Sequence, residues 1–506
     1  MSGVVAAGHP LSAEAGAKAL REGGNAVDAA VCAVLASFAV ESPLTGFGAG
    51  GFMMVHEPGA GPGPATTLVD FFVSAPGRDG IERGAELAPV PVHFDAETVQ
   101  TFYVGPASCG VPGTAAGLEQ ALRRFGSMPL SELVRPGVRL AREGAPVNAE
   151  QAYILDILEP IHARLAGTRE LYAPAGRTLR EGETFRFPEL AEALERYAAE
   201  GAEPFCRGEV AAALSAHVSE RGGTLGPEDL AAYEPVEREP IRVPFRGAEV
   251  LTNPPPSSGG ILVAYCLALL ERLGEESGPE QLVAAMGAAN RARGEAFAEA
   301  LYGAELTSTL LDPASLDATA GDLLGSTTHI SVLDADGMCA NVTCSNGSGS
   351  GVLVPGTGVI LNNMLGEEDL NPLGFHAIAP GRRVPSMMAP TVVLRGGEIE
   401  LGLGSAGSNR IRSAILQTIV RAVEAGMGAD EAVRAPRLHF EGGVVQAEPG
   451  IDEGALARIE ARGIPVLRRP AINLFFGGVQ AVARDRVTGR FSGGGDPRRG
   501  GSVALA

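Results

Sequence analysis

The sequence predicts a mixed α+β fold, in which a helix-rich segment, residues 1–326, precedes a strand-rich segment, residues 327–506. Hydrophobic residues make up 45% of the 506 residues and charged residues 20%, which is typical of a chain with a large packed core. Helical patterning dominates residues 115–245, whereas β-rich stretches and turn signals become frequent beyond residue 326. The two segments are expected to fold as one unit.

Caps and breakers mark the elements of the first segment. Ser12 is a candidate N-cap for a first helix, which should end at the pair Gly23-Gly24. Asn25 is a candidate N-cap for a second, more buried helix. The predicted elements are helices over residues 12–22 and 25–40, a strand over residues 52–56, and a helix over residues 261–273 that follows the proline-rich loop 254–260.

The second segment opens with a hairpin signal. Asp336 and Gly337 form a turn sequence between two β-rich stretches, residues 329–334 and 339–344, so these stretches are expected to pair. Further strands are expected over residues 358–361, 391–394 and 399–403, followed by a helix over residues 411–424.

The charge of the chain argues against two classes of partner. A net charge of −20 repels the phosphate backbone of nucleic acids and the anionic surface of a membrane. The longest apolar stretches are too short to span a bilayer, and no basic region followed by an apolar run opens the chain. A cytoplasmic protein that binds neither nucleic acid nor membrane is therefore expected.

The six cysteines are scattered along the chain and show no C-x-x-C spacing, so reduced and mostly buried thiols are expected. Cys339, Cys344 and His329 lie near one another in the sequence, but they lack the spacing of a zinc site. No metal and no other cofactor is expected.

One glycine-rich stretch, residues 402–407 (GLGSAG), matches the G-x-G-x-x-G fingerprint between a predicted strand and a predicted helix. A dinucleotide site would also need a further strand that carries an acidic ribose ligand, and a loop follows the helix instead. Dinucleotide binding is therefore the weaker interpretation. Backbone N–H groups at the start of a helix can equally hold an anion or an oxyanion.

Thr327, at the start of the hairpin, could be an ordinary strand residue, because threonine favours strands. It would be a nucleophile if the peptide bond before it were cleaved. The freed α-amine has a pKa of roughly 7.7–8.0 and could act as the base for its own hydroxyl. Nucleophile and base would then belong to one residue, and no Ser-His-Asp set would be required.

Several ordered segments resemble the gamma-glutamyltransferase (glutathione hydrolase) family. In the first segment the matching stretches are residues 24–30 (GNAVDAA), 48–53 (GAGGFM), 110–114 (GVPGT) and 254–260 (PPPSSGG). In the second segment they are residues 327–337 (TTHISVLDADG), 361–363 (LNN) and 435–439 (APRLH). The resemblance covers nearly the full chain.

The resemblance implies a four-layer αββα sandwich of the N-terminal nucleophile hydrolase type. It also implies self-cleavage between Ser326 and Thr327 into a large subunit, residues 1–326, and a small subunit, residues 327–506. The expected assembly is an αβ heterodimer, with or without further dimerisation, that acts on a small-molecule amide.

The same resemblance implies roles for individual residues. Thr327 corresponds to the nucleophile, and Ser345 to a hydroxyl residue that hydrogen-bonds the nucleophile's terminus. Gly407 and Ser408 correspond to the two backbone donors of an oxyanion hole, of which the second is normally glycine. Serine supplies the same N–H provided that its dihedral angles are ordinary.

The substrate-binding positions depart from the family pattern. Phe72 stands where the family has an arginine that clamps the glutamyl carboxylate, and an apolar ring cannot form that charge-assisted bond. Ser386 and Met387 replace a pair of serines. Glu367 is the displaced match to the acidic residue that holds the substrate amine, and Asn346, in a shortened loop, is the match to a family asparagine.

Arg382 or Arg383 could supply a replacement charge, although a solvated loop arginine is the simpler interpretation.

These departures favour a self-processing amidohydrolase that hydrolyses an amide other than a standard gamma-glutamyl amide, with a more apolar acyl group near Phe72. The first alternative is ordinary glutathione hydrolase or gamma-glutamyl transferase activity with a rearranged clamp. The second is a non-catalytic family member that acts as a binding module.

Overall fold

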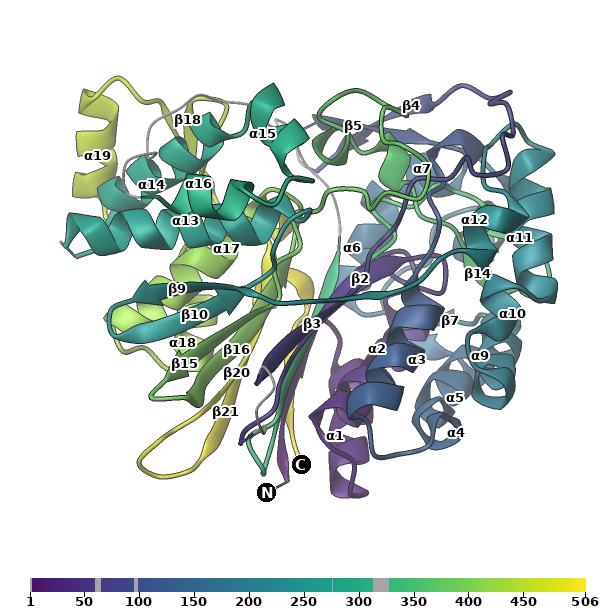
Figure 1. Cartoon of the computed structure of the whole chain (residues 1–506), viewed down its shortest axis with the longest axis horizontal. Helices are drawn as coiled ribbons and strands as arrows, with labels where there is room; N and C mark the ends of the chain where they lie inside the picture. Colours follow the sequence, from purple (N-terminus) through teal and green to yellow (C-terminus); the bar gives the residue numbers. More distant parts are fainter. Residues whose placement is uncertain (1, 60–64, 95–98, 275, 313–326) are drawn as a thin grey trace.

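The computed structural model describes residues 2–59, 65–94, 99–274, 276–312 and 327–506, and two stacked β-sheets form its centre (Figure 1). The larger sheet has seven strands, and each strand runs antiparallel to its neighbours. In spatial order they are β22 (Ser502–Leu505), β1 (Gly3–Ala7), β11 (Thr328–Asp334), β12 (Cys339–Ser345), β2 (Gly50–His56), β3 (Thr66–Phe71) and β8 (Val236–Arg238).

The second sheet has six strands and is also antiparallel throughout. Its inner face packs against the larger sheet, and side chains from both sheets fill the space between them, among them Phe52, Leu333 and Leu403. Its strands, in spatial order, are β21 (Phe491–Gly495), β20 (Gly478–Arg484), β16 (Glu398–Ala406), β15 (Thr391–Arg395), β10 (Ala248–Thr252) and β9 (Ile241–Phe245).

Strands from before and after residue 327 are interleaved in the larger sheet. Strand β11 lies between β1 and β12, and β12 pairs in turn with β2. The chain ends also meet: Ser2 donates its backbone N–H to the Ala506 carbonyl at 2.7 Å, and Figure 1 shows the two ends side by side. The division at residue 327 remains a prediction, but both segments contribute to both sheets.

Helices α1 (Pro10–Arg21), α2 (Ala26–Val40) and α3 (Thr114–Phe125) cover the outer face of the larger sheet. The predicted Asn25 cap is confirmed, because Asn25 and Asp28 form a capping box. The predicted Ser12 cap is wrong: His9 caps α1, and Pro10 occupies its first position. Proline suits that position because the N–H that it lacks has no partner inside a helix.

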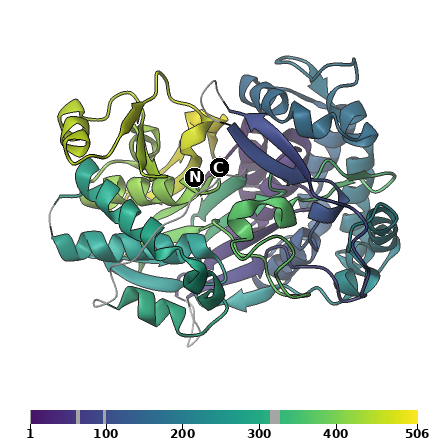
Figure 2. The same cartoon turned by 90° about the horizontal axis from the view of Figure 1, so that it is seen from above.

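On the opposite side, helices α13 (Ser258–Leu273), α17 (Arg410–Ile419) and α18 (Ala429–Arg434) cover the six-stranded sheet. Viewed from above, the strands lie between a purple-and-blue group of helices and a teal-to-yellow group (Figure 2). The helix predicted over residues 411–424 is present, although its last turn, Val420–Glu424, is π-helical.

The remaining elements frame these layers. The predicted helical character of residues 115–245 holds only to Ala231, because the alternating residues of Ile241–Phe245 form β9, with Ile241, Val243 and Phe245 buried. The further helices are α4 (Leu130–Leu133), α5 (Arg135–Glu143), α6 (Ala149–Ile157), α7 (Glu159–His162), α8 (Ala166–Tyr172), α9 (Pro188–Glu200), α10 (Glu203–Cys206), α11 (Glu209–Ser219), α12 (Pro227–Ala231), α14 (Pro279–Ala292), α15 (Glu295–Ala300), α16 (Leu306–Leu311) and α19 (Glu453–Ala461).

Four small sheets complete the part of the chain that the structure describes. They are β4 (Ala88–His93) with β5 (Val99–Val104), β6 (Ala145–Pro146) with β7 (Thr184–Phe185), β13 (Leu353–Val354) with β14 (Val359–Ile360), and β17 (Leu438–Glu441) with β18 (Val444–Ala447) and β19 (Val466–Arg468).

Gly402 and Gly404 serve sheet packing, because a Cβ atom on either would meet side chains of the larger sheet. Strand β16 pairs antiparallel with both β15 and β20, whereas a dinucleotide fold needs a parallel βαβ unit. A Cβ atom on Gly404 would lie 2.2 Å from the His329 ring of the facing sheet. The dinucleotide interpretation is therefore wrong, because the close approach of the two sheets explains this glycine.

No helix among the described residues is long and apolar enough to cross a membrane. In the same part of the chain, no group of three or more His, Cys, Asp or Glu side chains could hold a metal ion. All six cysteines are free thiols, and all except Cys206 are buried.

Candidate active site

Thr327 lies immediately before β11, at the end of a strand that is paired on both sides. Its side chain is buried, with 5% of the residue exposed. Ser326, on the other side of the predicted cleavage bond, lies outside the described residues. The position fixes the threonine firmly, because the next residue, Thr328, already pairs with Cys344 across the hairpin.

The hydroxyl of Thr327 faces Ser345. Its Oγ1 donates a hydrogen bond to Ser345 Oγ at 3.4 Å. Ser345 Oγ also accepts the backbone N–H of Gly347 at 2.8 Å. The hairpin register explains the contact, since Ser345 ends β12 beside the start of β11. In this intact chain Ser345 contacts the hydroxyl of Thr327, whereas the resemblance assigns it to the nucleophile's terminus.

Two buried ionisable side chains, Arg499 and Glu41, lie next to Thr327 and Thr328. Arg499 Nη1 donates to the Thr327 carbonyl at 3.3 Å. Glu41, at the end of α2, accepts the Thr328 hydroxyl at 2.8 Å and that of Ser12 at 3.4 Å. Burial raises the pKa of Glu41 to about 7, although both hydroxyl bonds oppose the shift. Sequence patterns give no signal for either side chain, because each reaches Thr327 or Thr328 only through the tertiary fold.

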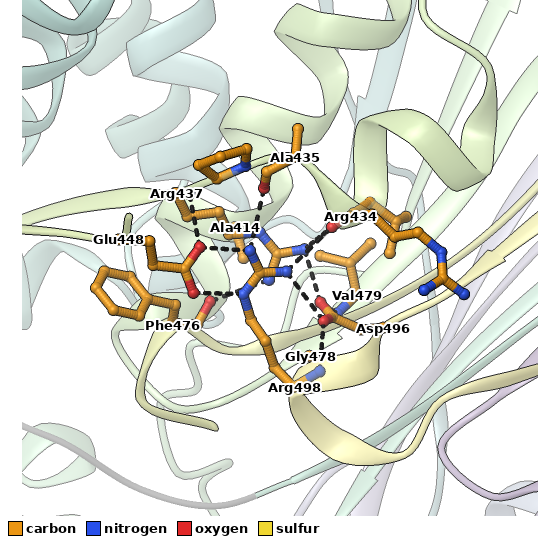
Figure 3. Close-up of polar contacts among 12 residues, drawn as sticks. Ala414, Arg434, Ala435, Arg437, Glu448, Phe476, Gly478, Val479, Asp496 and Arg498 are labelled. Atoms are coloured by element: carbon orange, nitrogen blue, oxygen red, sulfur yellow. Dashed lines mark hydrogen bonds and ion pairs between the residues drawn. The ribbon is translucent and has the colours of Figure 1, made fainter. Parts of the chain in front are cut away.

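A network of two arginines and two carboxylates supports the turn that carries Arg499 (Figure 3). Asp496 binds Arg437 Nη2 at 2.6 Å and Arg498 Nη1 at 3.1 Å, and Glu448 Oε1 accepts Arg498 Nε at 2.6 Å. Asp496 also accepts the Val479 N–H at 2.8 Å, which ties the turn to β20. Burial alone would raise the pKa of Asp496, but the two guanidinium groups hold it below its ordinary value.

A pocket of about 320 Å³, including its open mouth, lies against the Thr327 side chain. Most of the residues that the sequence analysis selected meet there. They are Phe72, Thr327, Ser345, Glu367, Ser386, Met387 and Ser408. Five further residues line the pocket that sequence reasoning missed, and four of them are large and apolar: Gly347, Met364, Leu370, Met388 and Ile411.

Two selected residues do not line this pocket. Gly407 directly precedes Ser408 in the turn between β16 and α17. Asn346 is fully buried, and neither polar atom of its side chain has a hydrogen-bond partner among the described residues. Its backbone is held, because Asn346 donates its N–H to the Leu44 carbonyl at 2.9 Å.

Glu367 is the ionisable side chain of the pocket, and no positively charged side chain lines it in the part of the chain that the structure describes. Burial raises the pKa of Glu367 to about 8, although the Ser348 N–H, which donates to Glu367 Oε1 at 3.0 Å, opposes the shift. The carboxyl is therefore mostly protonated at pH 7, and the empty pocket is close to neutral.

The site of the missing arginine clamp is apolar. Phe72 is buried and stacks on Phe52, with ring centroids 5.3 Å apart. Arg383, one candidate replacement, forms other contacts: its Nε lies 3.2 Å from Asp70 Oδ1, and its guanidinium stacks on Tyr233. Arg382, the other candidate, stacks on Tyr302. Neither arginine lines the pocket, and Arg383 is not the solvated residue that sequence reasoning favoured.

The Gly407–Ser408 turn has an unusual backbone. Both residues have positive φ, +118° at Gly407 and +53° at Ser408. The condition of ordinary dihedral angles at Ser408 is therefore not met, since few residues other than glycine adopt this left-handed region. Among the described residues, neither backbone N–H of this pair donates to a protein acceptor, so both are available to a ligand.

Comparisons with known proteins agree with this geometry. A family model described as "Gamma-glutamyltranspeptidase" matches residues 12–506. The chain is 32% identical to an "Acylase ACY 1 proenzyme" of Pseudomonas sp. (strain SE83), over 95% of this chain and 89% of that protein. It is 30% identical to a "Glutathione hydrolase proenzyme" of Bacillus subtilis (strain 168), over 99% and 91%.

A solved structure shares the whole fold. The structure of a cephalosporin acylase from Bacillus halodurans covers 100% of this chain with a TM-score of 0.82 and 26% sequence identity, and 96% of that chain is matched.

Proposed function

Because the chain belongs to the gamma-glutamyltranspeptidase family, we propose that it is an acylase that cleaves itself before Thr327 and hydrolyses an amide whose acyl group is apolar. The family makes the chain a proenzyme amidohydrolase of the N-terminal nucleophile type. Beyond the family, we propose Thr327 as the nucleophile, a four-layer αββα sandwich for the two sheets and their helices, and an apolar acyl group in the substrate.

Self-cleavage would start from the Thr327 hydroxyl. Its oxygen attacks the carbonyl carbon of Ser326, the peptide C–N bond breaks, and the nitrogen of Thr327 takes up a proton as a free amine. Water then hydrolyses the resulting ester, which leaves a carboxylate on Ser326 and restores the hydroxyl. The products are the subunits 1–326 and 327–506, which remain associated without a covalent bond as an αβ heterodimer.

Amide hydrolysis would reuse the same oxygen. The freed amine of Thr327 accepts the hydroxyl proton as the oxygen attacks the substrate carbonyl, and the N–H groups of Gly407 and Ser408 donate to the developing oxyanion. The amine product leaves with the proton, and water hydrolyses the acyl ester. Ser345 supports this assignment, since its Oγ accepts the hydrogen bond of the attacking hydroxyl.

The observation that carries the proposed acyl class is the lining of the pocket. Phe72, Met364, Met387 and Ile411 supply apolar surface, while no described lining residue supplies a positive charge for a carboxylate. A substrate α-carboxylate would be desolvated without a partner, which is costly in a buried site. Glu367, mostly protonated at pH 7, is also a weak partner for a substrate ammonium group.

Four anilides test the acyl class, because they differ only in charged groups: butanoyl, glutaryl, 4-aminobutanoyl and gamma-glutamyl anilide. We expect kcat/KM for the butanoyl compound to exceed that for the gamma-glutamyl compound at least tenfold. Faster turnover of gamma-glutamyl anilide would overturn the proposed acyl class and support ordinary glutathione hydrolase activity. The similarity to the glutathione hydrolase of B. subtilis favours that alternative. Thr327→Ala should be inactive on all four.

A further inference from the structure

Asp369 lies behind the Gly407–Ser408 turn and binds it directly. Ser408 Oγ donates a hydrogen bond to Asp369 Oδ2 at 2.9 Å, and Asn409 Nδ2 donates to Asp369 Oδ1 at 3.1 Å. The two oxygens of one carboxylate thus hold two consecutive residues of the turn. Asp369 itself is buried, within the short helical turn Glu368–Leu370.

The other groups around Asp369 keep this arrangement rigid. Asn409 Nδ2 also donates to Glu441 Oε1 at 2.7 Å, and its Oδ1 accepts Arg293 Nη1 at 3.2 Å. Ser408 lines the pocket that contains Thr327, whereas Asp369 lines a separate pocket on the far side of the turn, together with Arg293. Among the residues that line the Thr327 pocket, Ser408 is the one that hydrogen-bonds the Asp369 carboxylate through its side chain.

We propose that Asp369 is a positioning residue for acyl transfer, which holds the Ser408 side chain so that the Gly407–Ser408 backbone keeps its positive φ angles and leaves its N–H groups free for the oxyanion. The inference rests on the proposed function, in which these N–H groups stabilise the oxyanion. Asp369 is not a catalytic residue in this scheme, because it contacts neither the nucleophile nor the substrate.

The physical reason is the φ angle of +53° at Ser408. Glycine adopts positive φ without steric cost, whereas a residue with a Cβ atom does so at a penalty. A hydrogen bond to a carboxylate is stronger than one between neutral groups, so it can offset that penalty. Serine at this position therefore depends on Asp369, and glycine there would not.

A double-mutant cycle tests this dependence. Ser408→Gly removes the Cβ atom and the side-chain bond but keeps the backbone N–H, so it is the reference background of the cycle. Ser408→Ala, which keeps the Cβ but loses the bond, should lower kcat roughly tenfold relative to the native enzyme, with KM within twofold. Asp369→Asn should lower kcat roughly tenfold in the native background and less than threefold in the Ser408→Gly background.

Two results would overturn the proposal. One is an Asp369→Asn loss that is as large in the Ser408→Gly background as in the native one. The other is a Ser408→Ala enzyme as fast as the native one, and this test stands even if Asp369 variants fail to fold. Failure of the proposed function is distinguishable, because it would appear as amide hydrolysis by Thr327→Ala.

A pH profile supplies a readout that a purely structural role would not change. Burial raises the pKa of Asp369 to about 6, so its charge, and with it the strong form of the Ser408 bond, is lost as the pH falls through 6. We expect the decline of native kcat below pH 6 to weaken in Ser408→Gly, and an identical decline would contradict the proposal. The charged or titratable groups that face Asp369 are Arg293, Arg410, Arg412, Glu441 and Glu367.

Discussion

The hydroxyl of Thr327 hydrogen-bonds Ser345 Oγ at 3.4 Å across the open end of the β11–β12 hairpin. Because the hairpin register sets this contact, backbone pairing fixes the partner of the Thr327 hydroxyl. The Ser345 oxygen is also held by the Gly347 N–H, so it is oriented before any substrate enters.

Removal of this hydroxyl partner should slow both reactions of Thr327. A net hydrogen bond contributes about 1 kcal/mol, so Ser345→Ala is expected to lower the rate of self-cleavage and kcat roughly five- to tenfold. The appearance of two fragments on a denaturing gel, followed over time, measures the first rate. Ser345→Thr keeps a hydroxyl and is the control; equal rates for the alanine and native proteins would contradict the assigned role.

Phe72→Arg should shift the acyl preference towards gamma-glutamyl compounds. A charge-assisted bond to the substrate carboxylate contributes about 1.5–3 kcal/mol, so kcat/KM for gamma-glutamyl anilide is expected to rise at least tenfold while that for butanoyl anilide falls. Phe72→Met removes the ring without adding charge and should give no gain. If both variants change the two substrates equally, the identity of residue 72 does not set the preference.

Glu367 and Glu41 should each contribute stability that is lost as the pH rises from about 4.5 to 8. Burial raises the pKa of Glu367 to about 8 and that of Glu41 to about 7, so in this range the folded state binds protons that the unfolded state releases. Glu367→Gln removes the larger contribution, on the order of a few kcal/mol at one pKa unit per 1.36 kcal/mol. The melting temperature of this variant relative to that of the native protein should be higher at pH 8.5 than at pH 5.5; the same relative value at both pH values would rule out this origin.

Substitutions in the buried network around Asp496 should strongly destabilise the folded protein. Asp496→Ala leaves Arg437 and Arg498 without a shared partner in an interior where Asp496 is fully buried, so the loss is expected to be about 3–5 kcal/mol of unfolding free energy. Urea unfolding measures it. The matched control is Asp430→Ala, which breaks the exposed ion pair with Arg434 and should cost at most about 1 kcal/mol.

The sequence predicts those elements that are set by their own turn or cap residues. The β11–β12 hairpin follows from Asp336-Gly337 between two β-rich stretches, and the start of α2 follows from the Asn25–Asp28 capping box. The start of α1 is missed because histidine is not a usual cap residue, although Pro10 marks it. Strand β9 is missed because its neighbours are helical in pattern.

The residues of the candidate site also fall into two groups, those that the sequence predicts and those that depend on tertiary contacts. Thr327, Glu367 and Phe72 lie in recognisable motifs, and all three line the pocket. Asp369 and Arg499 are not predictable, because each acts through one tertiary contact with a distant segment: Asp369 with Ser408, and Arg499 with the carbonyl of Thr327. Likewise the left-handed backbone at Ser408 cannot be inferred from a serine.

The contact between Ser2 and Ala506 allows the nucleophile to be exposed without any bond cleavage. A circularly permuted gene could begin at codon 327, continue through residue 506 and a short glycine linker into residue 2, and stop at the end of the large segment. Once the initiator methionine is removed, as is usual before a small residue, such a chain would present the α-amine of Thr327 directly. Maturation and catalysis, which the natural order of the chain couples, could then be studied separately.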